Sequence, residues 1–363
     1  MGQATTERID FDRVPSRRGG DSHKWNRFAA AGEDVLAAWV ADMDFPAPEP
    51  VLAAVRERLD GPALGYSDPP ETLQPLVLER LQRLYGWRVQ PEWLVHLPGV
   101  VPGLFGAVRS VGAPGDGVII QGPNYHHFYG AVTYSDRRVL ELQNRLRAGR
   151  WEMDMNQLQG LAAGGARSLL LCNPHNPVGR VLTRSELEQV AQTCIAHDLL
   201  LCSDEIHAEL VLDQDKQHIP IATLSPEVAQ RSITLMSPSK GFNLPGIGGF
   251  ALAIVPNPEI RAALQRALHG FAGFPSALAY HAALAAWRDC DPWLAQLLDY
   301  LRGNRDYLES EIAKLPGLSM THVEATYLGW IDASELGVDS PFEHFLAHGV
   351  ALSDGEPMGS RTH

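Results

Sequence analysis

The middle of the chain alternates short apolar runs with amphipathic stretches, and this alternation limits the possible folds more than any other feature. Strands are predicted in five runs: Val118 to Gln121, Ser168 to Cys172, Leu199 to Ser203, Ile233 to Met236, and Phe250 to Val255. Strands that alternate with helices are typical of parallel sheets, because each helix carries the chain back to the same edge. We therefore expect an α/β fold with a mostly parallel sheet flanked by helices.

Helices are predicted both between and before these strands. Thr183, followed three residues later by Glu186, makes a capping box that starts a helix between the second and third strands. Upstream, apolar residues recur at helical spacing over Glu49 to Asp60 and over Glu71 to Tyr85. A break at Pro256 precedes a long helical region, after which the pattern is less regular.

These changes of pattern predict three parts. Residues 1–48 form an N-terminal segment that joins a small domain, and residues 49–265 form the large domain. Residues 266–363 form an interdomain helix and a smaller α+β domain.

Charge and composition exclude several functional classes. Thirty Lys and Arg against forty-three Asp and Glu give a net charge of −13, which disfavours nucleic acid and anionic membranes as partners. The first ten residues lack the apolar region of a signal peptide, and no run reaches about eighteen apolar residues, so we expect a cytoplasmic protein. The four cysteines form no C-x-x-C pair and the histidines lack metal-ligand spacing, which predicts reduced core thiols and no metal site.

Three polar clusters follow predicted strands, at the edge where open parallel sheets bind ligands. One runs from Asn173 to Arg180, the second from Ser203 to His207, and the third from Ser237 to Asn243. Each also has a structural explanation when taken alone: a rigid proline turn, an Asp at a helix N-cap, and a surface lysine. Together they offer an amine, a carboxylate, hydroxyls and backbone N–H groups, which are the groups that pyridoxal 5′-phosphate requires.

The order of these motifs resembles that of a known superfamily. N-P-x-N-P-x-G, then S-D-E-I-H, then S-x-S-K are similar to the motifs of fold type I pyridoxal-phosphate enzymes, the aminotransferase class I/II superfamily. Further segments resemble its MalY/PatB-type cystathionine β-lyase branch: Arg18 to Trp25, Trp39 to Phe45, Gly65-Tyr66, Cys172 to Gly179, and Ala325 to Leu328.

The resemblance implies a role for each residue around the cofactor ring. Lys240 would bind the cofactor as a Schiff base and move the substrate's Cα proton. Asp204 would pair with the pyridine nitrogen, while Asn176 would hydrogen-bond the ring hydroxyl oxygen with His207 nearby. Tyr125 would stack on the ring, although an ordinary core tyrosine is the alternative.

The resemblance also implies a phosphate site that two chains share. The hydroxyls of Ser237 and Ser239 and the backbone N–H groups of Val100 and Val101, at an expected helix start, would hold the phosphate. Tyr66 would reach across a homodimer interface to the phosphate of the neighbouring subunit.

The implied activity is β-elimination from L-cystathionine or a related cysteine S-conjugate, giving a thiol, pyruvate and ammonia. An aminotransferase on the same scaffold is the first alternative. A catalytically silent partner-binding protein is the second, although Lys240, Asp204 and Asn176 are all intact.

One departure from the family concerns the C-terminus. Family members continue into a strand with an arginine that grips the substrate carboxylate, whereas this chain ends at His363. Arg361 lies just ahead of the expected place and is not assigned that role. We expect a truncated chain that binds substrate weakly.

Overall fold

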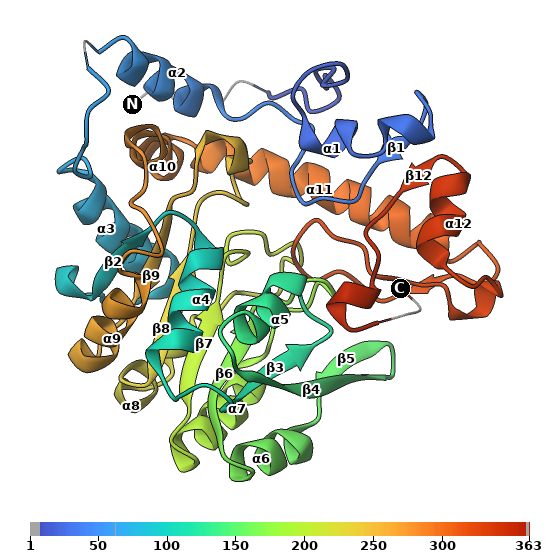
Figure 1. The fold of residues 1–363 in the computed structure, drawn as a ribbon. Coiled ribbons are helices and arrows are strands. Elements are labelled where there is room, and N and C mark those ends of the chain that lie inside the picture. Colours follow the sequence, from blue (N-terminus) through green and yellow to red (C-terminus); the bar gives the residue numbers. More distant parts are fainter. Residues whose placement is uncertain (1–7, 62, 361–362) are drawn as a thin grey trace.

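An eight-stranded sheet forms the centre of the molecule in the computed structural model, which describes residues 8–61, 63–360 and 363 (Figure 1). Its spatial order is β2 (Leu94–Leu97), β9 (Ala251–Ile254), β8 (Ser232–Met236), β7 (Leu200–Asp204), β6 (Ala166–Cys172), β3 (Gly117–Gly122), β4 (Arg138–Arg147) and β5 (Arg150–Met153). The five predicted strands are confirmed to within two residues at each end.

The strand directions decide which loops meet at one edge. Strands β4, β3, β6, β7 and β8 pair in parallel, while β9 runs antiparallel to both β8 and β2. The carboxyl ends of β2, β3, β6, β7 and β8 therefore share an edge with the start of β9. β5 pairs antiparallel with β4, so the sheet is mixed but mostly parallel, which confirms the predicted fold class.

Helices cover both faces of the sheet because the buried strands carry apolar side chains on both sides. In β3, Val118 and Ile120 join one cluster of buried side chains, while Ile119 between them joins another. The first cluster lies under α4 (Val100–Ser110), α5 (His126–Thr133) and α9 (Pro258–Leu268), and the second under α6 (Met155–Ala163), α7 (Arg184–Ala196) and α8 (Pro226–Ala229). The capping box of Thr183 and Glu186 is confirmed at the start of α7.

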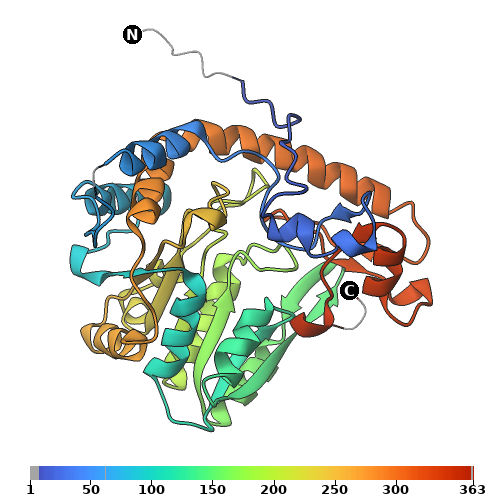
Figure 2. The ribbon, with the colours of Figure 1, turned by 45° about the horizontal axis from the view of Figure 1, so that its top comes forward.

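A third apolar cluster joins the N-terminal segment to four helices. These are α2 (Glu49–Leu59), α3 (Leu73–Tyr85), α10 (Ala277–Asp289) and α11 (Asp291–Ile312). The rings of Phe11 and Trp293 meet edge-to-face, with centroids 5.7 Å apart. Figure 2 shows α11 as the long helix at the top of the molecule, with the N-terminal segment beside it. Helix α3 begins two residues later than predicted, after the N-cap Thr72.

The remaining elements are short and lie near the two chain ends. They are α1 (His23–Asn26), β1 (Leu36–Ala37), β10 (Ser319–Met320), β11 (Ile331–Asp332), α12 (Pro341–Ala347) and β12 (Val350–Ala351). β1 pairs in parallel with β12, which joins the N-terminal segment to the C-terminal region. Within the described residues, no helix is both long and apolar enough to cross a bilayer.

Candidate active site

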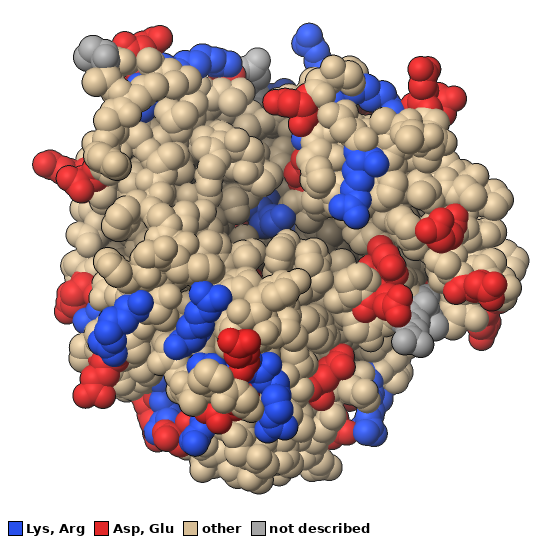
Figure 3. Space-filling view, viewed as in Figure 1, with Lys and Arg blue, Asp and Glu red and all other residues tan. Residues whose placement is uncertain are grey.

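The predicted site residues apart from Tyr66 come from five loops at one edge of the sheet. The loops follow β2, β3, β6, β7 and β8, and the loop after β8 leads into β9. The molecular surface is hollowed near the centre of this face, and a Lys or Arg side chain is visible inside the hollow (Figure 3). All predicted site residues except Tyr66 belong to these loops or to the strand and helix ends beside them.

Lys240 lies four residues beyond β8 and is partly buried. Its Nζ atom donates to the backbone oxygen of Ala41 at 2.6 Å. Burial lowers the pKa of this amine, and the carboxylates of Asp42 and Asp204 oppose that shift. A lowered pKa increases the share of neutral amine, the form that acts as a nucleophile or base.

Asp204 is the last residue of β7, and 5% of its surface is exposed. Its Oδ1 atom accepts a hydrogen bond from the Ile206 backbone nitrogen at 3.1 Å. Burial raises the pKa of Asp204 to about 7, and neighbouring Glu205 adds to the rise, while the Ile206 bond and Lys240 oppose it. A carboxylate in this position gains from a nearby cation.

Asn176 and His207 follow β6 and β7, which are neighbouring strands. The Asn176 backbone nitrogen donates to the Cys172 sulfur at 3.4 Å. His207 is 2% exposed, and within the described chain its buried Nδ1 atom has no hydrogen-bond partner. Burial, with a contribution from Lys240, lowers the pKa of His207 to about 3, so the ring is neutral. An unpartnered ring nitrogen at this edge is available to a bound polar group.

Tyr125 is the N-cap residue of α5 and is half-buried. Its backbone nitrogen donates to the Asn124 side chain at 2.8 Å. Burial and the charge of Asp204 raise the pKa of its phenol to about 12. Tyr125 follows β3 and Asp204 ends β7, and these parallel strands flank β6 with their carboxyl ends at the same edge of the sheet.

The predicted phosphate site combines a helix start with a serine turn. Val100 and Val101 begin α4, and the N-cap residue Gly99 offers no side chain to their N–H groups. Gly249, just before β9, packs so closely on this turn that a Cβ atom would lie 1.6 Å from the Pro98 oxygen. The turn after β8 lies on the opposite side of β9 from this helix start.

Ser237 and Ser239 form that turn. The Ser237 hydroxyl donates to the Phe250 backbone oxygen at 2.6 Å and lies 2.9 Å from the Ser239 hydroxyl. Ser237 Oγ also accepts from the Ser239 backbone nitrogen at 3.1 Å. The Ser237 proton is therefore engaged within the protein. The Ser239 hydroxyl is the better placed of the two to donate its proton to a ligand.

Tyr66 is not brought together with the other predicted residues. It lies in the extended segment before α3, and its relative exposure is 111%. Leu64 and Phe274 are also well exposed, at 66% and 91%. Arg361, which the sequence left unassigned, lies outside the described residues.

Two residues that the sequence did not single out lie at the lysine. Asn243 is three positions after Lys240, and its side-chain amide donates to the backbone oxygens of Met43 and Phe45 at 3.0 and 2.8 Å. The Tyr327 hydroxyl donates to Ala41, the same oxygen that Lys240 contacts, at 3.1 Å. Asn243 ends the third polar cluster and Tyr327 lies in a segment that carries the family resemblance, but their roles depend on contacts that are remote in sequence.

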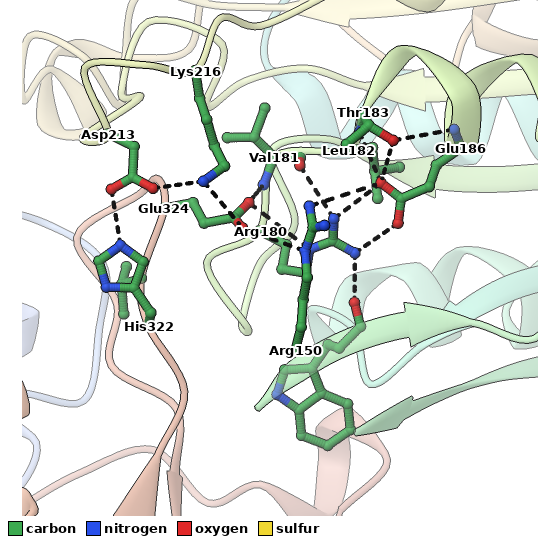
Figure 4. Close-up of polar contacts among 12 residues, drawn as sticks. Arg150, Arg180, Val181, Leu182, Thr183, Glu186, Asp213, Lys216, His322 and Glu324 are labelled. Carbon is green, nitrogen blue, oxygen red and sulfur yellow. Dashed lines mark hydrogen bonds and ion pairs between the residues drawn. The ribbon is translucent and has the colours of Figure 1, made fainter. Parts of the chain in front are cut away.

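A cluster of charged side chains holds the segment that bears Tyr327 (Figure 4). At its centre Glu324 is 6% exposed and accepts from the Val181 nitrogen at 2.8 Å. We call it the Glu324 cluster; its members are Arg150, Arg180, Glu186, Asp213, Lys216, His322 and Glu324. The cluster joins the loop after β6 to the segment that follows β10. It lies outside the cofactor edge, by which we mean the sheet edge that carries the predicted site residues.

No group of three or more potential ligand side chains is arranged for a metal ion within the described ranges. Asp204 and His207 instead fit a cofactor with a basic ring nitrogen and a polar ring substituent, because one gains from a cation and the other has a free ring nitrogen.

Comparison with known proteins gives consistent relatives. Residues 40–362 match the family model described as aminotransferase class I and II. The cystathionine beta-lyase PatB of Bacillus subtilis is 36% identical over 340 residues, which cover 91% of this chain and 86% of PatB. The crystal structure of OvoB matches with a TM-score of 0.94 and 45% identity, over 98% of this chain and 93% of OvoB. Cystalysin from Treponema denticola, whose structure contains pyridoxal 5′-phosphate, matches with a TM-score of 0.93 and 31% identity, over 97% and 92% of the two chains.

Proposed function

The chain belongs to the aminotransferase class I and II family, and on that premise we propose that it is a pyridoxal-phosphate-dependent carbon–sulfur β-lyase. Its substrate would be L-cystathionine or a related cysteine S-conjugate, and its products a thiol, pyruvate and ammonia. The observation that carries the proposal is the grouping of Lys240, Asp204 and His207 at one sheet edge, in a chain similar to a cystathionine β-lyase along 91% of its length.

We assign the residues around the cofactor as follows. Lys240 binds the cofactor covalently, Asp204 pairs with the ring nitrogen, and Asn176 and His207 contact the ring hydroxyl oxygen. Tyr125 stacks on the ring. The phosphate is held by Ser237, Ser239 and the backbone N–H groups of Val100 and Val101. The raised pKa of Asp204 supports its assignment, because a cationic ring nitrogen would relieve the cost of burying the carboxylate.

Pyridoxal phosphate, when bound, supplies an aldehyde that condenses with amines and a ring that accepts electrons released at the substrate's Cα. The protein's part is to move protons and exclude water. Lys240, with its lowered pKa, takes the Cα proton as a general base. The Ala41 oxygen, already 2.6 Å from Nζ, holds the lysine amine at the sheet edge.

We also propose that two chains form a homodimer in which Tyr66 contacts the neighbouring phosphate. The complete exposure of Tyr66, with exposed Leu64 and Phe274, supports an apolar contact surface. Mixing Tyr66→Ala with Lys240→Ala protein should restore part of the activity, since one site of each mixed dimer has both native residues. No recovery after subunit exchange would contradict shared sites.

A cytoplasmic location is proposed as well. All four cysteines are buried and unpaired, which suits a reducing compartment.

Aminotransfer is the second candidate, and the family model itself favours it, because the family is named for that reaction. The same lysine and carboxylate serve both reactions, since both begin with removal of the Cα proton. The outcome depends on whether the substrate loses its Cβ thiolate or regains a proton at the cofactor.

The deciding experiment is product analysis. Protein loaded with pyridoxal phosphate should show a visible absorbance band and release pyruvate and ammonia in equal amounts from L-cystathionine, with no keto acid added. Lys240→Ala should release neither, while Lys314→Ala, at an exposed lysine, should match the parent. An absolute need for a keto acid would favour the aminotransferase, and absence of the visible band would overturn both candidates.

A further inference from the structure

His175 lies in the loop that carries Asn176, and only 1% of its surface is exposed. Its backbone nitrogen donates to the Arg180 oxygen at 2.7 Å, and its backbone oxygen accepts from the Gly179 nitrogen at 2.8 Å. These two bonds close the loop on itself. The imidazole therefore extends from a fixed backbone position.

The imidazole reaches strands β3 and β4 and the loop that follows β3. Its Nε2 atom lies 2.8 Å from the Pro123 backbone oxygen. Its Nδ1 atom lies 3.3 Å from Gln121 Nε2 and 3.4 Å from Asn144 Nδ2. Pro123 precedes Tyr125 by two residues, so this one side chain joins the Tyr125 loop to the Asn176 loop.

Neighbouring hydrogen bonds determine which ring nitrogen carries the proton. Gln121 Oε1 accepts from the Cys172 backbone nitrogen at 3.3 Å, so its amide nitrogen is the end that faces His175. Nδ1 therefore accepts, and Nε2 carries the hydrogen that it donates to Pro123. A second proton on Nδ1 would oppose two amide donors.

Burial agrees with a permanently neutral ring. It lowers the pKa of His175 to about 3, with the Pro123 bond opposing the shift and the charge of Arg180 adding to it. The link to Pro123 is therefore unchanged across the pH range in which an enzyme of this kind works.

We propose that His175 is a positioning residue that fixes the spacing between Tyr125 and Asn176. With that spacing fixed, Tyr125 contacts the face of the cofactor ring while Asn176 contacts its edge. This inference rests on the proposed function, which assigns ring contacts to both residues. Both ring nitrogens of His175 already contact protein groups, so His175 acts through the Pro123 oxygen and through its own loop.

Three substitutions separate its contacts. His175→Leu removes both ring nitrogens. His175→Gln keeps an N–H at a similar distance from the backbone, able to reach the Pro123 oxygen. His175→Asn is one methylene shorter, so it retains a polar group near Gln121 and Asn144 but cannot reach Pro123.

The measurement is the Kd of the apoprotein for 4′-deoxypyridoxine 5′-phosphate, which lacks the aldehyde and so reports only non-covalent contacts. Loss of one buried hydrogen-bond link predicts a Kd about tenfold weaker for His175→Leu and His175→Asn, and a rescue to within about threefold for His175→Gln. The visible circular dichroism per bound pyridoxal phosphate should change in the first two variants and recover in the third.

Leu187→Ala is the matched control, because it opens a cavity in the buried face of α7, a helix that carries neither Tyr125 nor Asn176. It should lower the melting temperature while leaving the Kd within about twofold of the parent.

The outcomes are distinguishable. If the parent protein does not bind the analogue, the proposed function fails and this inference fails with it. If the parent binds it and His175→Leu binds equally well, the function stands and the positioning role is overturned. Equal binding by His175→Asn and His175→Gln also overturns it, and that pair decides the question if His175→Leu does not fold.

Discussion

The cofactor edge and the Glu324 cluster both bury charged groups, but Glu324 has ion-pair partners whereas Asp204 has none among the described residues. In the Glu324 cluster, Glu324 lies 3.5 Å from both Arg150 and Lys216, and Glu186 binds Arg180 through two hydrogen bonds at 2.8 and 3.0 Å. At the cofactor edge, Asp204 has no cation in ion-pair contact within the described chain, and His207 Nδ1 has no partner.

The difference separates charge that serves folding from charge that serves binding. A buried carboxylate whose cations are already present contributes to the fold, and removing it leaves those cations uncompensated. A buried carboxylate without a cation costs stability until a ligand supplies one. Four substitutions test this contrast.

The largest expected effect is on catalysis at the cofactor edge. Lys240→Ala should lower kcat by at least about 10³-fold, as expected for loss of a general base. Its apoprotein should unfold at nearly the parent temperature, because within the described residues the amine makes a single hydrogen bond, to Ala41. Pyruvate release and thermal melting measure the two effects, and a large fall in melting temperature would show that Lys240 also supports the fold.

Glu324→Ala should show the reverse pattern. It leaves Arg150, Arg180 and Lys216 without their shared carboxylate and removes the bond to Val181, so stability should fall by about 3 kcal/mol. Urea unfolding of the apoprotein measures the loss. Glu335→Ala, at an exposed position, should change stability by less than about 0.5 kcal/mol. An equal loss in Glu324→Ala and Glu335→Ala would show that the Glu324 cluster does not stabilise the fold. The distinction between that cluster and the cofactor edge would then be lost.

Asp204→Asn should stabilise the apoprotein in a pH-dependent way. The pKa of Asp204 is about 7 in the fold against 3.8 ordinarily, so the folded state favours the protonated acid. Its cost is absent below pH 3.8, grows as the pH rises towards 7, and is constant above that. The variant's advantage in urea unfolding should grow over that pH range and become constant above about pH 7, while cofactor affinity falls. A gain that does not vary with pH would point to packing instead.

The smallest expected effect concerns the helix cap at Thr183, next to Glu186 of the Glu324 cluster. Thr183 caps α7 and its hydroxyl also contacts Glu186 at 2.8 Å. Thr183→Ala should cost about 1 kcal/mol, the usual value of an N-cap. Ser185→Ala, inside the first turn of α7, is the comparison. A loss near that of Glu324→Ala would mean that the cap and the cluster act as one unit.

Much of the fold could be predicted because its signals are local. The strand at Ser168 to Cys172 and the capping box at Thr183 depend on adjacent residues, and both are confirmed. β4 was missed because its side chains are mostly polar and only one is fully buried. β2 was missed because it has four residues and alternates in burial.

The site divides in the same way. Lys240, Asp204 and Asn176 follow strands whose ends could be located, so their shared edge was predictable from strand direction. The contacts of Asn243, Tyr327 and His175 could not be predicted, because each depends on a backbone oxygen in another segment of the chain. The roles assigned to the ring and phosphate residues remain predictions that the proposed experiments test.

The bonds from Asn243 to Met43 and Phe45 also have a consequence for biosynthesis. The paired residues are 200 and 198 positions apart, so the earlier segment leaves the ribosome long before its partner exists. At about 5–20 residues per second the delay is roughly 10–40 s. We expect the Met43 amide, which donates to Asn243 Oδ1 at 2.9 Å, to exchange hydrogen freely in stalled nascent chains that end before residue 243. Protection in such chains would show that another partner holds the segment during synthesis.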